Sequence, residues 1–462
     1  MLIADNARTI IAPSTPTGAG AIAILRLSGH RAFPIAALFL KPGFAPANPK
    51  PRMAYMLSVM DGKKLLDKSV VLFYKGPNSY TGEDTVEIFC HNSPYIIRSI
   101  LNLAIKVGAS PAGPGEFTFR AFLKGKLDLA QAEAINDLIA SQTESAHRAA
   151  IGQVEGHLSR QVMGLKSKLI HLLAGLEARL DDSYGDMPSF DRGGFLTETR
   201  TVMAAIQKLS AGFENGRRVK EGIKVVIAGA PNSGKSSLLN ALLGYPRAIV
   251  SPVAGTTRDT IEAELEIDGF SVNFTDTAGL AENTPDSIER QGINRAMAAL
   301  KTADIILLVK DASAPQTRMD RTALETALEA SGHGAKLIKI FNKCDLLPAA
   351  KNNRARIRSE LAISCKTGIG LSNVTRSIIN REKRYFAERT PALVTSARHF
   401  EALTGAASEL EKLHKLKAKL PFPLELAAEH LREALNALSS ILGETAPEEI
   451  LADIFKSFCV GK

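Results

Sequence analysis

A glycine-rich loop after an apolar run is the feature that most constrains the fold of this 462-residue chain. Residues 229–236 read Gly-Ala-Pro-Asn-Ser-Gly-Lys-Ser, between an apolar run at 225–228 and a helix-like run at 238–242. This order is that of a phosphate loop, in which backbone N–H groups and the start of a helix bind phosphate oxygens. We expect Lys235 to reach the β and γ oxygens and the Ser236 hydroxyl to bind Mg²⁺. The loop therefore predicts a strand–loop–helix unit within an α/β domain.

Strand-like runs recur around this loop. They lie at residues 225–228, 272–274, 305–309 and 337–341. Helix-like segments alternate with them, which predicts an α/β domain with a largely parallel sheet. On either side, apolar residues spaced by three and four predict amphipathic helices over 162–180 and 410–442. Neither helical stretch could bury its apolar stripe alone, so we expect the two to pack into one discontinuous domain.

Two further elements follow the phosphate loop in the order of a switch GTPase. Asp276-Thr277-Ala278-Gly279 comes directly after a strand-like run, where Asp276 can hold Mg²⁺ through water and the Gly279 N–H can bind the γ-phosphate. Thr256-Thr257 lies between this motif and the phosphate loop, and Thr257 is expected to complete the Mg²⁺ shell.

The choice of base is indicated by Asn342-Lys343-Cys344-Asp345, which closes the last strand-like run. The Asp345 carboxylate can accept two hydrogen bonds, from the N1–H and the 2-amino group of guanine, and adenine offers neither donor. A buried acceptor of this kind rejects the wrong base by roughly 10⁴-fold or more. Ser364-Cys365-Lys366 fits a second loop that contacts the base. The sequence therefore predicts GTP rather than ATP as the nucleotide.

The residue after the Asp-x-x-Gly motif is Leu280, where Ras-like enzymes have a glutamine that orients the attacking water. An apolar side chain cannot orient water. Another group must do so here, and another positive charge must replace the arginine finger.

These motifs and runs define the predicted fold class. It is an α/β P-loop GTPase domain inserted in a discontinuous all-helical domain and preceded by an α+β N-terminal domain, whose short strand-like runs alternate with Gly/Pro turns. The predicted boundaries are 1–120 for the N-terminal domain, 121–217 and 387–462 for the two helical parts, and 218–386 for the GTPase domain.

Composition restricts the partners and the compartment that we expect for the protein. A formal charge of +9 permits an RNA partner but is scattered along the chain, so it is weak evidence for one. The four cysteines lack the spacing of a zinc site or disulfide framework, which favours a reducing compartment. No signal pattern or apolar run of about 18 residues is present, so we expect a cytoplasmic protein without a membrane span.

Four segments outside the GTPase motifs carry a family resemblance. They are Tyr80-Thr81-Gly82-Glu83-Asp84, Pro114-Gly115-Glu116-Phe117-Thr118, the run from Gly125 to Ala134, and the terminal Phe458-Cys459-Val460-Gly461-Lys462. With the GTPase motifs, they make the chain resemble the MnmE (TrmE) family of tRNA-modification GTPases over essentially its full length. Two segments depart from the family pattern, namely Thr15 to Gly20 and His91-Asn92-Ser93.

The resemblance implies a function. A potassium-dependent GTPase would act with an FAD-dependent partner of the MnmG (GidA) type, as a homodimer within a heterotetramer. Together they would install an aminomethyl or carboxymethylaminomethyl group at C5 of the tRNA wobble uridine. The one-carbon unit would come from 5-formyl- or 5,10-methylene-tetrahydrofolate, bound in the N-terminal domain.

Site residues follow from the same resemblance. Folate is expected at Arg26, Glu87, Lys126 and the C-terminal Lys462. Potassium is expected at the Asn232 side chain and in the loop that contains Ser251, Val253 and Thr256. A hydrogen bond that only stabilises the loop is the alternative role for Asn232.

The catalytic residues implied are Lys235, Glu289 as the group that orients water, and Cys459 as a reactive thiol near folate. Glu282 competes with Glu289, because the segment from Asp276 to Glu289 is one residue longer than the family pattern. For Cys459 the alternative is a small buried apolar residue. The nucleotide site as a whole is predicted to comprise Asn232, Ser233, Gly234, Lys235, Ser236, Ser237, Ser251, Val253, Ala254, Gly255, Thr256, Thr257, Asp276, Thr277, Ala278, Gly279, Asn342, Lys343, Asp345, Ser364, Cys365 and Lys366.

Two other functions fit parts of the sequence. A ribosome-assembly GTPase would share the nucleotide motifs but not the N-terminal folate pattern or the terminal Cys-x-Gly-Lys. A membrane-associated signalling GTPase would need a lipidation signal or a basic amphipathic anchor, which we do not find.

Overall fold

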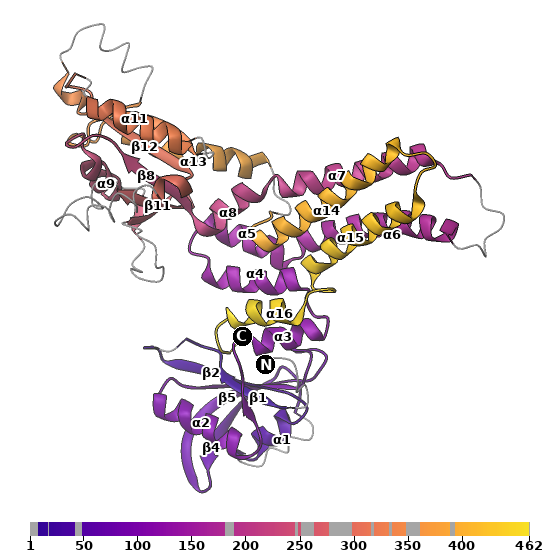
Figure 1. Cartoon of the computed structure of the whole chain (residues 1–462). Helices are drawn as coiled ribbons and strands as arrows, with labels where there is room; N and C mark the ends of the chain where they lie inside the picture. Colours follow the sequence, from indigo (N-terminus) through magenta and orange to yellow (C-terminus); the bar gives the residue numbers. More distant parts are fainter. Residues whose placement is uncertain are drawn as a thin grey trace, which may run out of the picture. The chain divides into compact units, whose positions relative to one another are not determined.

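The computed structural model describes residues 8–16, 18–41, 49–180, 189–244, 248–250, 263–276, 298–315, 318–331, 335–347, 361–388 and 393–461. The chain divides into two compact units. The first consists of Met1–Asn136, Gln153–Ile206 and Ala402–Lys462, and the second of Asp137–Gly152 and Gln207–Glu401. The second unit is thus inserted in the chain of the first. Figure 1 shows the elements of each unit.

The N-terminal part of the first unit is built on a seven-stranded sheet of order β3-β4-β5-β6-β2-β1-β7. All neighbouring strands are antiparallel except the parallel pair β1 and β7. Its elements are β1 (Ile10–Pro13), β2 (Ile22–Ser28), α1 (Ala32–Ala37), β3 (Leu40–Lys41), β4 (Ala54–Asp61), β5 (Lys64–Tyr74), β6 (Thr85–His91), α2 (Pro94–Lys106) and β7 (Ser110–Pro111).

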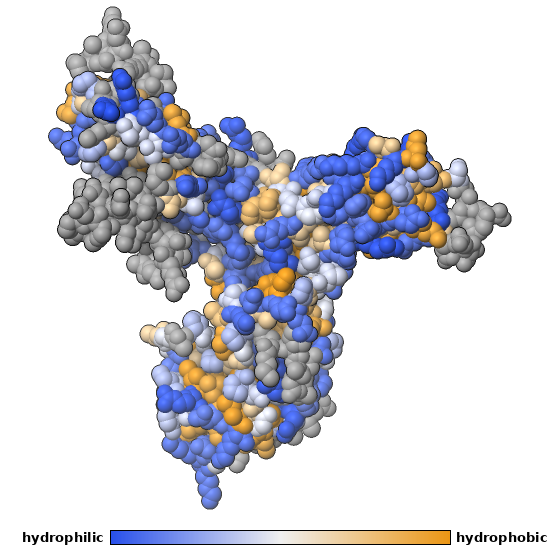
Figure 2. Space-filling model, in the orientation of Figure 1, coloured by the Kyte–Doolittle hydropathy of each residue, from blue (hydrophilic) through white to orange (hydrophobic). Residues whose placement is uncertain are grey.

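Buried and more exposed residues alternate along these strands, which places one face of the sheet in the core. Ala23, Leu25 and Leu27 of β2 are fully buried, with α1 and α2 residues such as Ile35 and Ile100 in the same cluster. The predicted α+β domain is confirmed. Figure 2 shows hydrophobic residues among hydrophilic ones on the visible face of this domain.

Two of the family-like segments meet in a buried ion network. Arg120 donates to Glu116 Oε1 at 2.8 Å and to Glu83 Oε2 at 3.1 Å, and the Arg120 side chain is 3% exposed. Ser28 Oγ donates to the same Glu83 oxygen at 2.8 Å. A buried charge needs such partners to offset its desolvation. Glu83 of the first segment and Glu116 of the second therefore pair with the same buried arginine.

The helical part of the first unit joins the segments on either side of the insertion. The elements that lie wholly in this unit are α3 (Glu116–Leu123), α6 (His157–Leu180), the 3₁₀ turn η2 (Leu416–Ala418), α15 (Leu424–Leu442) and α16 (Glu448–Lys456). Residues of both units make up α4 (Leu129–Ala140), α5 (Glu144–Val154), α7 (Arg192–Ser210) and α14 (Ala397–Lys415). Helices α6 and α15 pack side by side (Figure 1). The predicted discontinuous helical domain is therefore confirmed.

The predicted apolar stripes form the contacts of these helices. Val162, Leu169 and Leu176 of α6 are almost fully buried, as are Leu431 and Leu438 of α15. Among the described helices, none is long and apolar enough to cross a membrane.

The C-terminal segment is anchored on the N-terminal domain. Val460 forms a β-bridge with Pro114, and Ser14 Oγ donates to the Gly461 carbonyl at 3.1 Å. Gly461 has a φ of +100°, and a Cβ there would clash with the Pro13 carbonyl. Phe455 packs edge-on against Phe119, with 5.0 Å between ring centroids. The segment from Phe455 to Gly461 is therefore held beside the predicted folate domain.

The second unit contains a seven-stranded sheet of order β14-β13-β12-β8-β11-β10-β9. The five strands from β14 to β11 are parallel, and β10 and β9 add an antiparallel edge. The four strand-like runs predicted from the sequence are β8, β11, β12 and β13. The elements are α8 (Phe213–Glu221), β8 (Ile223–Ala228), α9 (Lys235–Leu243), β9 (Ala248–Val250), β10 (Ala263–Ile267), β11 (Phe270–Asp276), β12 (Ile305–Asp311), α11 (Arg318–Ser331), β13 (Lys336–Asn342), the 3₁₀ turn η1 (Cys344–Leu346), β14 (Leu361–Ala362) and α13 (Leu371–Glu388).

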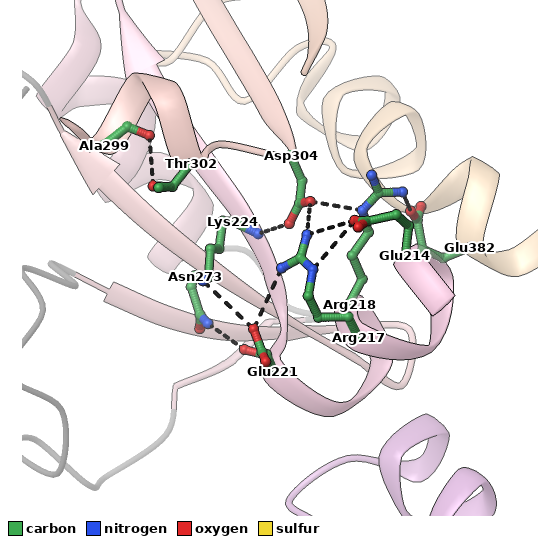
Figure 3. Close-up of polar contacts among 10 residues, drawn as sticks. All are labelled: Glu214, Arg217, Arg218, Glu221, Lys224, Asn273, Ala299, Thr302, Asp304 and Glu382. Atoms are coloured by element: carbon green, nitrogen blue, oxygen red, sulfur yellow. Dashed lines mark hydrogen bonds and ion pairs between the residues drawn. The ribbon is translucent and has the colours of Figure 1, made fainter. Parts of the chain in front are cut away.

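A charged cluster fixes α8 to the sheet of this unit (Figure 3). Asp304, whose side chain is 4% exposed, accepts from Arg218 Nε at 2.9 Å and from Arg217 Nη2 at 2.7 Å. Its other oxygen accepts the Lys224 N–H at 2.9 Å. Arg218 also lies 3.4 Å from Glu382 of α13. The cluster ties α8 to the start of β12 and to α13.

Candidate active site

The phosphate loop connects the buried strand β8 to α9, as the sequence predicts. Gly234 has a φ of +95°, and a Cβ there would clash with the Asn342 side-chain amide. Glycine is required at this position, because the loop approaches the strand β13 so closely. Asn232 also has a left-handed backbone, with a φ of +60°.

Lys235 is buried at the start of α9, and its Nζ lies over the loop. It donates to the carbonyls of Gly229 and Ala230, both at 3.1 Å. The hydroxyl-bearing Ser236 and Ser237 follow in the first turn of α9 and are exposed. A lysine and exposed hydroxyls at a helix start suit an anionic ligand with a bound cation.

Asn342, at the end of β13, brings three predicted motifs together. Its Nδ2 donates to the Ser233 carbonyl in the phosphate loop at 3.1 Å. Its Oδ1 accepts the Lys343 N–H at 2.8 Å and the Cys365 N–H at 3.2 Å. The phosphate loop and the two predicted base-contacting segments therefore share one buried side chain.

The cysteines of the base-contacting segments are protonated at neutral pH. Burial raises the pKa of Cys365 to about 11, against an ordinary value of 9.0. Burial and the charge of Asp345 also raise the pKa of Cys344. Neither thiol is therefore activated, which leaves them roles in packing and backbone support.

Sequence reasoning missed Asp311, which ends β12 and lies in register with Asn342. Asp311 Oδ2 is 2.6 Å from Lys343 Nζ, and that Nζ also donates to the Asn232 carbonyl at 2.9 Å. Burial opposes ionisation, but hydrogen bonds from Lys343 and Ser313 outweigh it and lower the pKa of Asp311. The sequence does contain a signal for Asp311. It is an acidic residue at the carboxyl end of the strand that neighbours the Asn-Lys-x-Asp strand.

Several predicted residues fall outside the described part of the chain. These are Ser251, Val253, Ala254, Gly255, Thr256, Thr257, Thr277, Ala278, Gly279, Leu280, Glu282, Glu289 and Lys462. Asp276 is described only as the last backbone residue of β11. The predicted potassium loop and the residue that orients water therefore stay predictions.

Two of the predicted folate residues are brought together on the N-terminal sheet. Arg26 of β2 lies opposite Glu87 of β6, and Arg26 Nε donates to Glu87 Oε1 at 2.8 Å. Tyr74 donates to the second Glu87 oxygen at 3.3 Å. Burial, together with the Glu87 charge, raises the pKa of Tyr74. Lys126 instead donates to the Pro77 carbonyl at 2.9 Å.

The two segments that depart from the family pattern contact each other. Asn92 Nδ2 donates to the Gly18 carbonyl at 2.8 Å, and a Cβ at Gly20 would lie 3.2 Å from the same nitrogen. The Asn92 side chain of one departing segment therefore pairs with the backbone of the other. Cys459, by contrast, is exposed, so the alternative of a buried apolar residue is wrong for it.

Comparison with known proteins gives matches over nearly the whole chain. Residues 9–126 match the family model described as the GTP-binding protein TrmE N-terminus, and residues 129–459 match the MnmE helical domain. The tRNA modification GTPase MnmE of Flavobacterium psychrophilum is 37% identical over 461 residues, covering 98% of this chain and 99% of that protein. The MnmE of Aquifex aeolicus is 39% identical over 454 residues, again covering 98% and 99%. A crystal structure of Aquifex aeolicus Era is 30% identical, with a TM-score of 0.26, and covers 34% of this chain and 55% of its own.

Proposed function

This chain belongs to the MnmE (TrmE) family of tRNA-modification GTPases, and we propose that it hydrolyses GTP to drive modification of the tRNA wobble uridine. The observation that carries this proposal is the side chain of Asn342. It joins the Ser233 carbonyl of the phosphate loop to the Cys365 N–H of the second base-contacting loop. Because Asn342 fixes the phosphate loop and the second base-contacting loop relative to each other, the two loops can bind the phosphates and the base of one nucleoside triphosphate.

The base is guanine in this proposal. Asp345 lies in the turn η1, directly after the Asn342 and Lys343 contacts. The Cys344 N–H donates to the Ile363 carbonyl at 3.1 Å, which fixes this turn against the segment that leads into Ser364-Cys365-Lys366. An acceptor held on a fixed turn discriminates between bases because the wrong base leaves it unpaired.

Two cations fit the chemistry of the loop. Mg²⁺ would be held by the exposed Ser236 hydroxyl, with Thr257 and, through water, Asp276, and would neutralise charge on the phosphates. K⁺ would be held by Asn232, with Ser251, Val253 and Thr256 from the following loop. The Asn232 side chain is exposed in the phosphate loop, where its amide oxygen could bind the cation.

Glu289 is proposed to orient the attacking water, since Leu280 cannot. Lys235 would stabilise the charge that develops on the β and γ oxygens, a role that its burial at the start of α9 strengthens. Glu282 is the competing candidate for the water. The nucleotide cycle would then act as a switch that changes the contacts between subunits.

The folate proposal is supported by the Arg26 and Glu87 pair. A carboxylate can pair with the pterin amide and amine, and a guanidinium or ammonium group can meet a glutamate tail. The side chains are 21% and 14% exposed, so both remain accessible from the surface of the sheet. The anchored C-terminal segment would add Lys462 and Cys459 to this site.

Further proposed features are a cytoplasmic homodimer and an FAD-dependent MnmG-type partner in a heterotetramer. Ile22, Met56 and Leu65 of the N-terminal domain are large apolar residues that are exposed, and a protein contact would cover residues of this kind. A ribosome-assembly GTPase is disfavoured, because such a protein has no need of the TrmE-type N-terminal domain matched at 9–126.

The first test compares GTP hydrolysis in potassium chloride and sodium chloride at matched ionic strength. We expect faster hydrolysis in potassium, and loss of that advantage in Asn232→Ala. Equal rates in the two salts would refute the cation mechanism. In parallel, nucleoside analysis of tRNA from cells that lack the protein should show unmodified wobble uridine, and normal modification would refute the tRNA function.

A further inference from the structure

Lys343 and Asn232 share an unusual conformation. Only four non-glycine residues of the described part of the chain have a positive φ, and two of them are Asn232 at +60° and Lys343 at +63°. A side chain makes this backbone region costly, so it persists only where the surroundings hold it. Here the two strained residues are joined directly, because Lys343 Nζ donates to the Asn232 carbonyl at 2.9 Å.

Asp311 fixes the donor of that bond. Its Oδ2 lies 2.6 Å from Lys343 Nζ, while its Oδ1 accepts the N–H and the hydroxyl of Ser313 at 2.8 and 2.6 Å. The Ala312 N–H donates to the Asn342 carbonyl at 2.8 Å, so the turn after β12 is itself bonded to the end of β13. Ser313 and the bonded turn therefore fix the Asp311 carboxylate, and its Oδ2 lies toward Lys343.

We propose that Asp311 is a positioning residue that sets the site of the activating monovalent cation by holding Lys343 against the Asn232 backbone. This inference rests on the proposed potassium-dependent GTPase. Asp311 acts through Lys343 and does not touch the nucleotide or the cation. It links the base-recognition motif to the residue whose side chain is the proposed potassium ligand.

Solvent exposure of the Asp311–Lys343 pair limits how much its loss should weaken potassium binding. The Asp311 and Lys343 side chains are 23% and 33% exposed, so water partly replaces the ion pair when it is broken. For Asp311→Asn we expect the potassium concentration at half-maximal GTPase rate to rise about three- to tenfold, the range of a partly solvated charge-assisted bond. The rate at saturating potassium should stay near that of the wild type, because the groups that contact GTP remain.

The experiment measures GTP hydrolysis by the full-length protein against potassium concentration, at constant ionic strength kept with sodium chloride. The variants are Asp311→Asn, and Asp311→Glu, which restores the charge and should recover part of the potassium affinity. The matched control is Asp268→Asn, which breaks another lysine–aspartate pair, with Lys383 at 2.5 Å, in the β10–β11 turn. That control should titrate with potassium as the wild type does.

The outcomes separate this inference from the proposed function. If the wild type depends on potassium and Asp311→Asn has the same half-saturation, the inference is wrong and the proposed function stands. If the wild type hydrolyses GTP equally in sodium, the cation mechanism itself fails. Should Asp311→Asn not fold, Ser313→Ala removes only one donor to the carboxylate and should shift the potassium titration in the same direction. An unshifted potassium titration in Ser313→Ala would then overturn the inference.

Discussion

The Asn342 side-chain amide donates to the Ser233 carbonyl at 3.1 Å across a separation of 109 residues. This bond fixes the end of β13 to the phosphate loop. A substitution of Asn342 should therefore also disturb phosphate binding, and it should lower GTP affinity by more than the loss of a base contact alone.

Asp345→Asn tests the base assignment. An amide presents a donor where guanine N1–H also donates, whereas xanthine has a carbonyl in place of the 2-amino group. We expect the preference to move from GTP toward xanthosine triphosphate, with GTP affinity reduced by roughly a hundredfold or more. Competition binding with a fluorescent guanine nucleotide measures this, and unchanged GTP affinity would exclude Asp345 as the guanine acceptor.

Glu289→Ala tests the group that orients water. Hydrolysis should slow by about 10²- to 10⁴-fold, the usual contribution of general acid–base or water-positioning groups, while GTP binding stays nearly unchanged. Single-turnover hydrolysis and nucleotide titration separate the two effects. Glu282→Ala is the matched comparison, and an unimpaired Glu289→Ala with a slow Glu282→Ala would transfer the role to Glu282.

The motifs could be predicted from the sequence because each is a short run with its own local geometry. The strand before the phosphate loop, the position of Asn342 and the pairing of the two helical stretches all follow from spacing and apolar period. Asp311 and the pair of Arg120 with Glu83 could not be predicted in this way, because their partners are set by strand register and tertiary packing. Asn92 and Gly18 are a similar case, since 74 residues separate them.

Asp304→Ala tests the charged cluster of Figure 3. The change leaves Arg218, whose side chain is 8% exposed, without its nearest carboxylate, and removes the acceptor of the Lys224 N–H. Breaking a buried pair costs about 3–5 kcal/mol, so the thermal transition of the nucleotide-binding unit should fall by several degrees. Glu214→Ala is the control, because the Glu214 side chain is 56% exposed and its pair with Arg217 contributes less than about 1 kcal/mol. Equal shifts in both variants would contradict the assignment.

Cys365 provides a test based on pH. Its pKa of about 11 lies above the ordinary 9.0, so the folded state keeps the proton over that interval. The associated stability is fully present below pH 9 and is lost as the pH rises through 11. At pH 8 its thiolate fraction is about a hundredfold below that of an ordinary thiol, so alkylation should be correspondingly slow. Mass spectrometry after iodoacetamide treatment should show the exposed Cys459 modified first, and rapid labelling of Cys365 in folded protein would contradict the burial.

Gly461→Ala tests whether the terminal segment completes the folate site. A Cβ at this residue would clash with the Pro13 carbonyl, and a φ of +100° is poorly tolerated by alanine, so the segment should detach from the N-terminal domain. Displacing a site group by about 1 Å can lower a rate about a hundredfold. We therefore expect wobble-uridine modification to fall by at least about tenfold in cells that carry the variant. GTP hydrolysis by the purified variant should be unchanged, because the phosphate loop is untouched.

The control for this variant is Gly405→Ala in α14, where an added Cβ meets open space. It should leave both modification and hydrolysis as in the wild type. Loss of hydrolysis together with modification in Gly461→Ala would point to unfolding rather than to a displaced segment, and circular dichroism distinguishes these. Full modification in a folded Gly461→Ala protein would show that the C-terminal segment, Cys459 included, is not needed at the folate site.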